Sequence, residues 1–491
     1  MKKVVIALCG VVALGAAGCT LIAWNTGKLM PERINAMLEH ANQQLQVALG
    51  HEGEATIELL SLSPNTFSSD ARYRVTYQAV GRDPVQLEFA DHIEYGPLPW
   101  SKVKQLQLMP VMAASNFSLE KTQSSSPWFA FSKGEVPVQG HITVNYDETV
   151  STQISVAPLE IFARGVKWDS SAISLRMDSI KGAETVRVVG KMANLKAQQE
   201  EKSPYPLVLD LEGATLIAQL GAGAHGLHTG WLKMNLRDIR LALGDKALSF
   251  GRFARHDTYE FAEDGYSARQ TFSVENMQFA GWPYGSARLV WRAEGLDPAA
   301  LRNMLNLRNG PAWNQIKAAA AQEASAAATG GAQSQDDAGT EFHAALSNLL
   351  ANRPRVVVEE LSFKTSGGES RADLEVQLRR PDTDDSSLAG LVTQMSESAR
   401  INLKLSKATV DTWEGPFSLR MYMRDINTGQ PLSRRWWDIV SREARRDPLL
   451  VVTDDSVVMD LRLKTPDDIE LNGKKINREE FSRVIGRAAA Q

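Results

Sequence analysis

Residues 71–78 read ARYRVTYQ, so apolar or aromatic residues at every second position alternate with polar or charged ones. Residues 85–89 (VQLEF) and 287–293 (ARLVWRA) follow the same period. Successive side chains of a β-strand point to opposite faces, so this period predicts strands with one apolar and one polar face. Further strand-like runs occupy residues 139–163, 184–195, 205–218 and 230–242. The prediction is a mainly β (α+β) protein with a large, mostly antiparallel sheet, extended or curved, and a few flanking helices.

The strand pattern stops at residues 298–307, which are predicted as a short helix. Residues 317–340 come next and are rich in Ala, Gln, Ser and Gly, a composition typical of a linker. Alternation then resumes in a hairpin over residues 361–378, and helices are predicted at residues 433–446 and after Asn477. We therefore predict a β-rich region, a linker, and a second β-rich region with C-terminal helices, over residues 51–316, 317–340 and 341–491.

The N-terminus predicts the compartment. Lys2 and Lys3 precede an apolar run over residues 4–24, which spans roughly 30 Å as a helix, the thickness of a bilayer's hydrocarbon core. Lysines ahead of the run favour a cytoplasmic N-terminus. Residues 1–24 are thus predicted as an uncleaved signal-anchor, one transmembrane helix in the bacterial inner membrane with the bulk of the chain in the periplasm. Two alternatives stay open: a cleaved signal peptide, and a lipoprotein lipidated at Cys19.

The segment after the anchor, residues 25–50, is predicted as a juxtamembrane amphipathic helix. Within it, residues 31–49 carry apolar side chains at helical spacing. Packing on the sheet and a role as a stalk or dimerisation helix are both open.

Composition narrows the range of partners and chemistry. The formal net charge is -4, which gives no electrostatic reason to expect a nucleic-acid partner. The two cysteines, Cys9 and Cys19, both lie in the N-terminal apolar run. The rest of the chain therefore has no disulfide, no thiolate nucleophile and no cysteine-containing metal site.

Three short motifs carry a family resemblance. They are Trp24-x-Thr26-Gly27-Lys28 after the apolar run, residues 93–99 (IEYGPLP), and residues 469–474 (IELNGK). Together they resemble the YdgA-like family of bacterial inner-membrane-anchored periplasmic proteins, which is largely uncharacterised. The Ala-rich insert and Tyr95, where the family pattern has His, are departures. The resemblance implies an anchored periplasmic protein, leaves a homodimer open, and assigns no functional residue.

Several motifs associated with chemistry have simpler interpretations. Residues 221–226 (GAGAHG) match G-x-G-x-x-G, but a strand-like run comes after them where the nucleotide-binding motif needs a helix, so a turn is predicted. His225, His228 and His256 lack a helix that would align them as metal ligands. Paired aspartates, such as residues 454–455, suit turns. We predict no catalytic, cofactor-binding or metal-binding residue and no cofactor.

Two groups of residues are candidates for contact surfaces. The first would meet a membrane or a partner, since arginine beside tryptophan on a short helix suits anionic headgroups, although packing on the sheet with the apolar side inward is the favoured explanation; its members are Arg434, Arg435, Trp436, Trp437 and Arg442. The second would be a lipid-facing sheet surface, whose members are Tyr73, Val75, Tyr77, Leu87, Phe89, Leu289 and Trp291.

These features support three functional hypotheses. The leading one is a non-enzymatic binding or scaffolding protein of the cell envelope that engages another envelope component, such as an envelope protein. The second is a lipid-binding or lipid-transport protein that shelters acyl chains on an apolar sheet face. The third is a periplasmic hydrolase, which requires titratable groups converging in one pocket.

Overall fold

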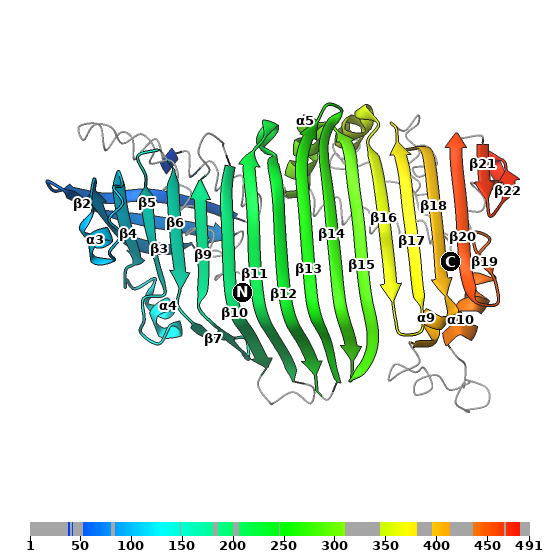
Figure 1. Ribbon diagram of the computed structural model, residues 1–491, viewed down its shortest axis with the longest axis horizontal. Helices are drawn as coiled ribbons and strands as arrows, with labels where there is room; N and C mark the ends of the chain where they lie inside the picture. Colours follow the sequence, from blue (N-terminus) through cyan, green and yellow to red (C-terminus); the bar gives the residue numbers. More distant parts are fainter. Residues whose placement is uncertain are drawn as a thin grey trace. The chain divides into compact units, whose positions relative to one another are not determined.

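The computed structural model describes residues 38–39, 42, 53–79, 84–147, 149–179, 185–199, 206–244, 246–309, 344–380, 395–412, 436–465 and 468–481. These residues form mainly antiparallel β-structure with a few short helices, which confirms the predicted fold class (Figure 1). The predicted anchor and linker lie outside them. Among the described residues, no helix has both the length and the apolar character needed to cross a membrane. The chain divides into two compact units, one containing most of the residues up to 222 and the other most of the residues from 223 onward.

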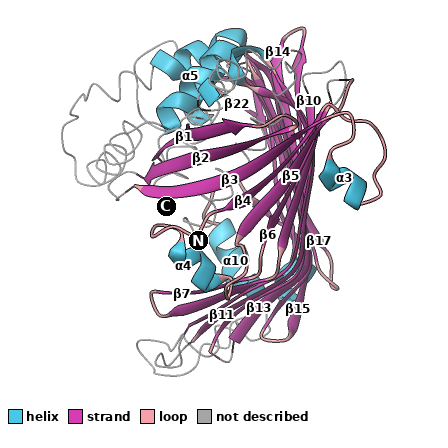
Figure 2. Cartoon of the chain, turned by 90° about the vertical axis from the view of Figure 1, so that its left-hand side faces the viewer, coloured by secondary structure: helices cyan, strands magenta, loops and turns pink. Residues whose placement is uncertain are grey.

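Strands dominate the first unit. In chain order its elements are β1 (Gly53–Pro64), β2 (Ser68–Ala79), β3 (Val85–Tyr95), α3 (Trp100–Lys104), β4 (Ala113–Leu119), α4 (Ser126–Phe131), β5 (Val138–Val144), β6 (Val150–Val156), β7 (Leu159–Ala163), β8 (Val166–Ser170), β9 (Ile173–Ser179), β10 (Thr185–Gln199) and most of β11 (Leu207–Ala222). Antiparallel pairing runs from β1 through β6 in chain order and continues to β9 and β10. β8 pairs with both β10 and β7. Figure 2 shows α3 and α4 on opposite sides of this sheet.

The alternation of the sequence appears directly as alternation of burial in this unit. Along β3, Leu87, Phe89 and Ile93 are buried, while Gln86 and His92 are exposed on the other face. The buried face is apolar, and its burial is the main source of this unit's stability. A glycine permits one close approach, because a Cβ on Gly140 would lie 2.1 Å from the Phe117 ring.

The second unit is also antiparallel. Its elements are η2 (Ala224–Gly226), β12 (His228–Leu243), β13 (Lys246–Ala262), β14 (Gly265–Phe279), β15 (Trp282–Leu296), α5 (Pro298–Asn309, of which the first part belongs to this unit), η3 (Leu350–Asn352), β16 (Arg355–Lys364), β17 (Glu369–Leu378), β18 (Ser396–Ser406), α9 (Lys407–Asp411), α10 (Trp436–Ala444), β19 (Val451–Val452), β20 (Ser456–Thr465), β21 (Asp468–Leu471) and β22 (Lys474–Ile476). Pairing runs in chain order from β12 to β18 and then passes to β20, which also pairs with β19 and β21.

Strands on either side of the predicted linker pair directly with each other. In the β15–β16 ladder, Leu289 lies opposite Leu361 and Ala287 opposite Phe363. The sheet is therefore continuous between the two β-rich regions predicted from the sequence. The predicted hairpin over residues 361–378 is formed by β16 and β17, and α5 confirms the short helix predicted after β15.

Candidate functional site

The first unit closes its apolar sheet face into a core. Val75, Tyr77, Leu87 and Phe89 are at most 7% exposed and belong to one buried cluster, and Tyr73 packs against that cluster. The prediction that these five residues form a lipid-facing surface is therefore wrong.

Other elements of the same unit cover this face. Trp128 and Phe129 of α4 belong to the cluster, together with apolar side chains of β4 to β7 and β9. The rings of Phe89 and Phe117 meet edge to face, with centroids 6.4 Å apart. The alternating pattern identified an apolar face correctly, but the protein itself occupies it.

One carboxyl group lies within this buried face. Asp91 is 8% exposed and accepts a hydrogen bond of 2.5 Å from Ser115 Oγ. Burial raises the pKa of Asp91 to about 6, and the hydrogen bond from Ser115 opposes that rise in part. Asp91 is therefore a buried carboxyl group whose position is fixed by a hydrogen bond from Ser115.

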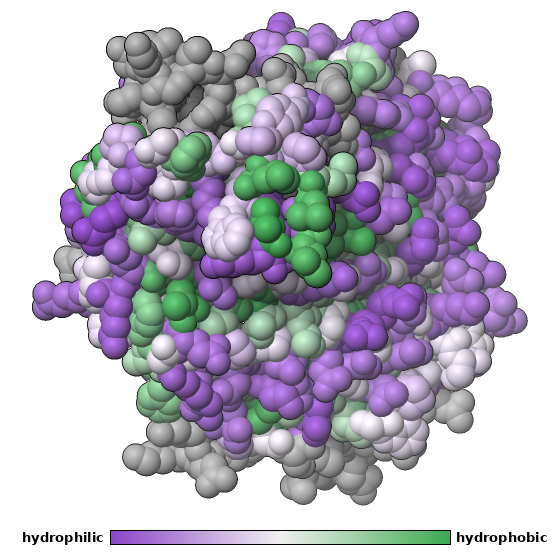
Figure 3. All heavy atoms as spheres, turned by 60° about the vertical axis from the view of Figure 1, so that its left-hand side comes forward, coloured by the Kyte–Doolittle hydropathy of each residue, from purple (hydrophilic) through white to green (hydrophobic). Residues whose placement is uncertain are grey.

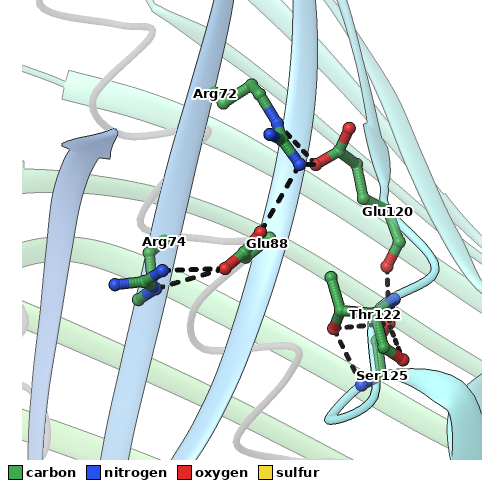
Figure 4. A network of polar contacts seen from close by, with 6 residues as sticks. All are labelled: Arg72, Arg74, Glu88, Glu120, Thr122 and Ser125. Carbon is green, nitrogen blue, oxygen red and sulfur yellow. Dashed lines mark hydrogen bonds and ion pairs between the residues drawn. The ribbon is translucent and has the colours of Figure 1, made fainter. Parts of the chain in front are cut away.

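A network of ion pairs lies on the opposite, polar face of β2 and β3 (Figure 4). Glu88 accepts from Arg74 at 2.9 Å and lies 3.5 Å from Arg72, which also donates through Nε to Glu120 at 2.8 Å. Behind it, Ser125 Oγ donates to the carbonyl oxygen of Glu120. The Arg72 side chain is 49% exposed, so water screens these pairs and the network adds little stability.

The second unit aligns apolar residues in rows across its strands. One row runs Leu236, Phe253, Val274, Ala287 and Phe363, each opposite the next in the ladders from β12 to β16. Residues directly opposite in a ladder project to the same face. The row therefore forms one apolar stripe across five strands.

Two further rows run beside this stripe. Met234, Arg255, Phe272, Leu289, Leu361 and Ala372 form one row, and Leu232, Asp257, Gln270, Trp291, Val358 and Leu374 form the other. We call the apolar members of all three rows the apolar face. It crosses strands β12 to β17 and includes Leu289 and Trp291, the other two residues predicted to face lipid.

The apolar face is less buried than the core of the first unit. Its side chains are half-buried, and Leu361 is 50% exposed. Buried hydrophobic clusters among the described residues lie in the first unit and around β18 to β22, and none of them contains a residue of β12 to β17. The described parts of the second unit thus leave this face open over several strands.

The other face of these strands is charged. Arg269 pairs with Glu359 at 2.6 Å and Arg288 with Glu360 at 3.2 Å, while Arg292 lies 3.3 Å from Glu359. Val290 lies among these charged residues on β15 and is 3% exposed. The ion pairs make this face polar, in contrast to the apolar face.

A polar cluster interrupts the apolar face at β13 and β14. Asp257 is 1% exposed. Its carboxylate accepts hydrogen bonds from Arg255 Nη2 at 2.6 Å and from the Tyr259 hydroxyl at 3.0 Å. Gln270 Nε2 donates to the same hydroxyl at 3.2 Å, and the Arg255 guanidinium lies over the Phe272 ring at 5.4 Å. The interpretation of the sequence missed this cluster, although Arg255, Asp257 and Gln270 stand at positions where the alternation demands apolar residues.

The predicted arginine and tryptophan helix corresponds to α10. Trp437 is 7% exposed in a cluster with Val410, Ala444 and Val457, and Trp436 packs against that cluster. Packing, the other interpretation of this helix, therefore accounts for the buried Trp437 and for part of the Trp436 side chain, which stays partly exposed. Arg442 is half-buried, and Arg434 and Arg435 lie outside the described residues.

The remaining motifs take the conformations of turns. After β11, Gly223 donates to the carbonyl oxygen of Leu227 at 2.8 Å, and His225 has a φ of 57°. Within the described residues, no group of three or more His, Cys, Asp or Glu side chains is placed to hold a metal ion. Asp455 accepts from Thr453 Oγ1 at 3.0 Å inside a turn, as predicted for the pair at residues 454–455.

Over the residues that the structure describes, fold and surfaces define a mainly antiparallel β protein with one buried apolar face and one half-buried apolar face. Over residues 1–479 the chain matches the family described as "Bacterial protein of unknown function (DUF945)", and it belongs to that family. It is similar to Protein YdgA of Escherichia coli (strain K12), with 23% identity over 507 residues that cover 100% of this chain and 98% of that protein.

Two other relatives extend the comparison. Uncharacterized protein YihF of Escherichia coli (strain K12) is 21% identical over 489 residues, covering 94% of this chain and 95% of that protein. An uncharacterized protein of Haemophilus influenzae (strain ATCC 51907 / DSM 11121 / KW20 / Rd) is 27% identical over 158 residues, covering 32% of this chain and 42% of that protein. The resemblance to YdgA-like proteins is thereby confirmed. No solved structure matches the chain.

Proposed function

We propose that the protein is a non-enzymatic binding protein of the bacterial cell envelope that holds acyl chains of a lipid on its apolar face. In this proposal residues 1–24 anchor the chain in the inner membrane, and the two units lie in the periplasm. The observation that carries the lipid assignment is the set of half-buried apolar rows across β12 to β17.

The dimensions of the face suit an acyl chain. Neighbouring strands lie about 4.8 Å apart, so the five spacings from β12 to β17 span roughly 24 Å. One leaflet of a bilayer provides roughly 15 Å of hydrocarbon, half of the core thickness. An extended acyl chain could therefore lie along one row and touch apolar side chains over its whole length.

The chemistry of the face also suits an acyl chain. Burial of hydrocarbon against hydrocarbon is non-directional and scales with the area removed from water. A flat ligand with hydrogen-bonding groups would leave those groups unpaired over most of these rows. The polar cluster around Arg255 and Asp257 is the exception, and it lies at β13 and β14 rather than across the whole face.

Site-specific photocrosslinking in the full chain tests the proposal. A benzoylphenylalanine at position 361 lies on the apolar face, and one at position 371, on the next strand, lies on the charged face. After irradiation in cells, mass spectrometry of the purified protein should find phospholipid adducts at position 361 and not at position 371. A protein adduct at position 361 would instead favour the scaffolding function, and the absence of any lipid adduct would refute lipid binding.

A matched pair of substitutions gives a second readout. Leu361→Glu and Arg371→Glu each introduce one carboxylate on the same hairpin, at side chains that are both exposed. Native mass spectrometry of the detergent-extracted full chain should show less co-purified lipid for Leu361→Glu only. Equal lipid content in both variants and the parent chain would show that the lipid is bound elsewhere.

A further inference from the structure

The loop between β3 and β4 exposes large apolar side chains on the first unit, and these side chains are distinct from the apolar face of the second. We call residues 97–111 (PLPWSKVKQLQLMPV) the α3 loop. Figure 3 shows apolar side chains gathered in one patch on the face of the molecule that it draws. Five of the exposed large apolar residues belong to the α3 loop: Leu98 (50%), Trp100 (63%), Leu106 (85%), Leu108 (63%) and Met109 (81%).

Two backbone hydrogen bonds join the two ends of the α3 loop at its base. Gly96 N donates to Met112 O at 2.8 Å and Val111 N to Pro97 O at 2.9 Å. A Cβ on Gly96 would lie 1.9 Å from Val111 O, so only glycine allows this closure. Ser101 N donates to Glu94 Oε2 at 2.9 Å and holds the start of α3 against β3.

Leu106 is exposed in spite of an unfavourable backbone conformation. Leu106 has a φ of 58°, a left-handed conformation that is unfavourable for a leucine, and yet its side chain is 85% exposed. A turn with no other role would use Gly or Asn at this position. The loop therefore adopts an unfavourable conformation that presents a leucine to its surroundings.

The charges of the loop identify the partner. Residues 97–111 contain Lys102 and Lys104 and no acidic residue. Lys104 is exposed, and its Nζ lies 5.8 Å from the centre of the Trp100 ring. Lys102 is buried, with its Nζ donating to Gln107 Oε1 at 3.0 Å, so Lys104 is the exposed cation of the loop. Glu94, at the base, is 13% exposed and is bonded by Ser101.

Exposed leucines, a methionine and a tryptophan next to the exposed Lys104, with no carboxylate among them, suit the boundary between acyl chains and anionic headgroups. We infer that the α3 loop inserts into the surface of a bilayer that contains anionic phospholipid. Trp100 and Lys104 lie at the headgroup level, and Leu106, Leu108 and Met109 enter the acyl region. The inference is independent of lipid binding on the apolar face, because it concerns another unit and other residues.

Depth-dependent fluorescence in the full chain tests this insertion. Cys9 and Cys19 are replaced by serine, and a nitrobenzoxadiazole dye is attached at Leu106→Cys or, as the matched control, at Phe162→Cys, another exposed apolar position of the first unit. Each protein is reconstituted into phosphatidylethanolamine–phosphatidylglycerol vesicles with or without lipids that carry a doxyl quencher on the acyl chain. The dye at position 106 should be quenched and blue-shifted, and the dye at position 162 should not.

Three results would overturn the inference. The first is equal quenching at both positions, and the second is no quenching at position 106. The third is efficient disulfide crosslinking between two unlabelled Leu106→Cys chains in place of quenching, because the patch would then be a contact between two copies of the chain. Lys104→Gln adds a test of charge: removing one positive charge should weaken quenching at position 106 about fivefold in phosphatidylglycerol vesicles and little in pure phosphatidylcholine. An equal effect in both lipids would remove anionic recognition from the inference.

Discussion

Truncating Phe89 tests whether the first unit's apolar face is a closed core. Phe89 is 1% exposed and its ring meets Phe117 edge to face. Phe89→Ala removes buried apolar surface and leaves a cavity, which costs about 3–5 kcal/mol. Phe89→Leu keeps much of the volume and should cost less, about 1 kcal/mol.

Hydrogen exchange with detection by mass spectrometry measures this effect locally. Amides of β3 and β4 that exchange through opening of the first unit should exchange faster in Phe89→Ala by roughly a hundredfold to several thousandfold. Amides of β16, in the second unit, should keep their rates. The control is Phe162→Ala, which removes a ring that is 59% exposed and should change the rates in β3 very little.

The comparison between the two phenylalanines decides the interpretation. If Phe89→Ala accelerated exchange no more than Phe162→Ala, the face of β3 would not be packed by protein. The lipid-facing interpretation of Tyr73, Val75 and Leu87 would then have to be restored. A large effect that was equal in β16 would instead show that the two units open together.

Substitutions at Asp91, at the Arg255–Asp257 pair and at Arg72 have defined outcomes. The pKa of Asp91 is raised to about 6 from 3.8, so its contribution to stability falls as pH rises between these values; Asp91→Asn should remove this dependence in urea unfolding at pH 4.5 and 7. Arg255→Met leaves Asp257 buried without its cation and should lower the free energy of unfolding by about 3–5 kcal/mol, measured by hydrogen exchange in β13. Adding Asp257→Leu to the same chain should restore most of the lost stability. Arg72→Ala should leave the urea midpoint of the first unit unchanged within error, because its pairs are screened by water; a clear loss would mean that the pair with Glu120 is stronger than its exposure implies.

Alternation in the sequence was sufficient to predict the strands and which side chains share a face. The period of two in residues 71–78 and 287–293 became β2 and β15, with apolar residues on one side of each. Turn and cap residues were also predictive: Asn477 Oδ1 accepts from Glu480 N at 2.8 Å, as the expected helix start requires. These features depend on residues close in sequence.

The cover over each apolar face could not be predicted in this way, because it depends on residues far apart in the chain. In the first unit, Trp128 and Phe129 lie some forty residues beyond Phe89, yet they complete its core. The pairing of β15 with β16 likewise joins strands on either side of a long composition-biased segment, which the sequence alone indicated as a boundary. Identical alternation therefore led to a closed core in one unit and a half-buried face in the other.

The α3 loop shows the opposite limitation. Residues 97–111 carry no helical or strand period, so periodicity predicts nothing there, and the segment IEYGPLP was useful only as a family resemblance. Apolar residues in a short aperiodic segment are usually buried by the fold, and only the exposed fractions of Leu106 and Met109 show that these are not. Composition does contain one usable signal: fifteen residues with several large apolar side chains, two lysines and no carboxylate. A core segment has no need to exclude carboxylates while keeping lysines, whereas a segment that meets anionic headgroups gains from both. Charge asymmetry within an aperiodic apolar loop is thus the feature of the sequence that separates a contact surface from a core.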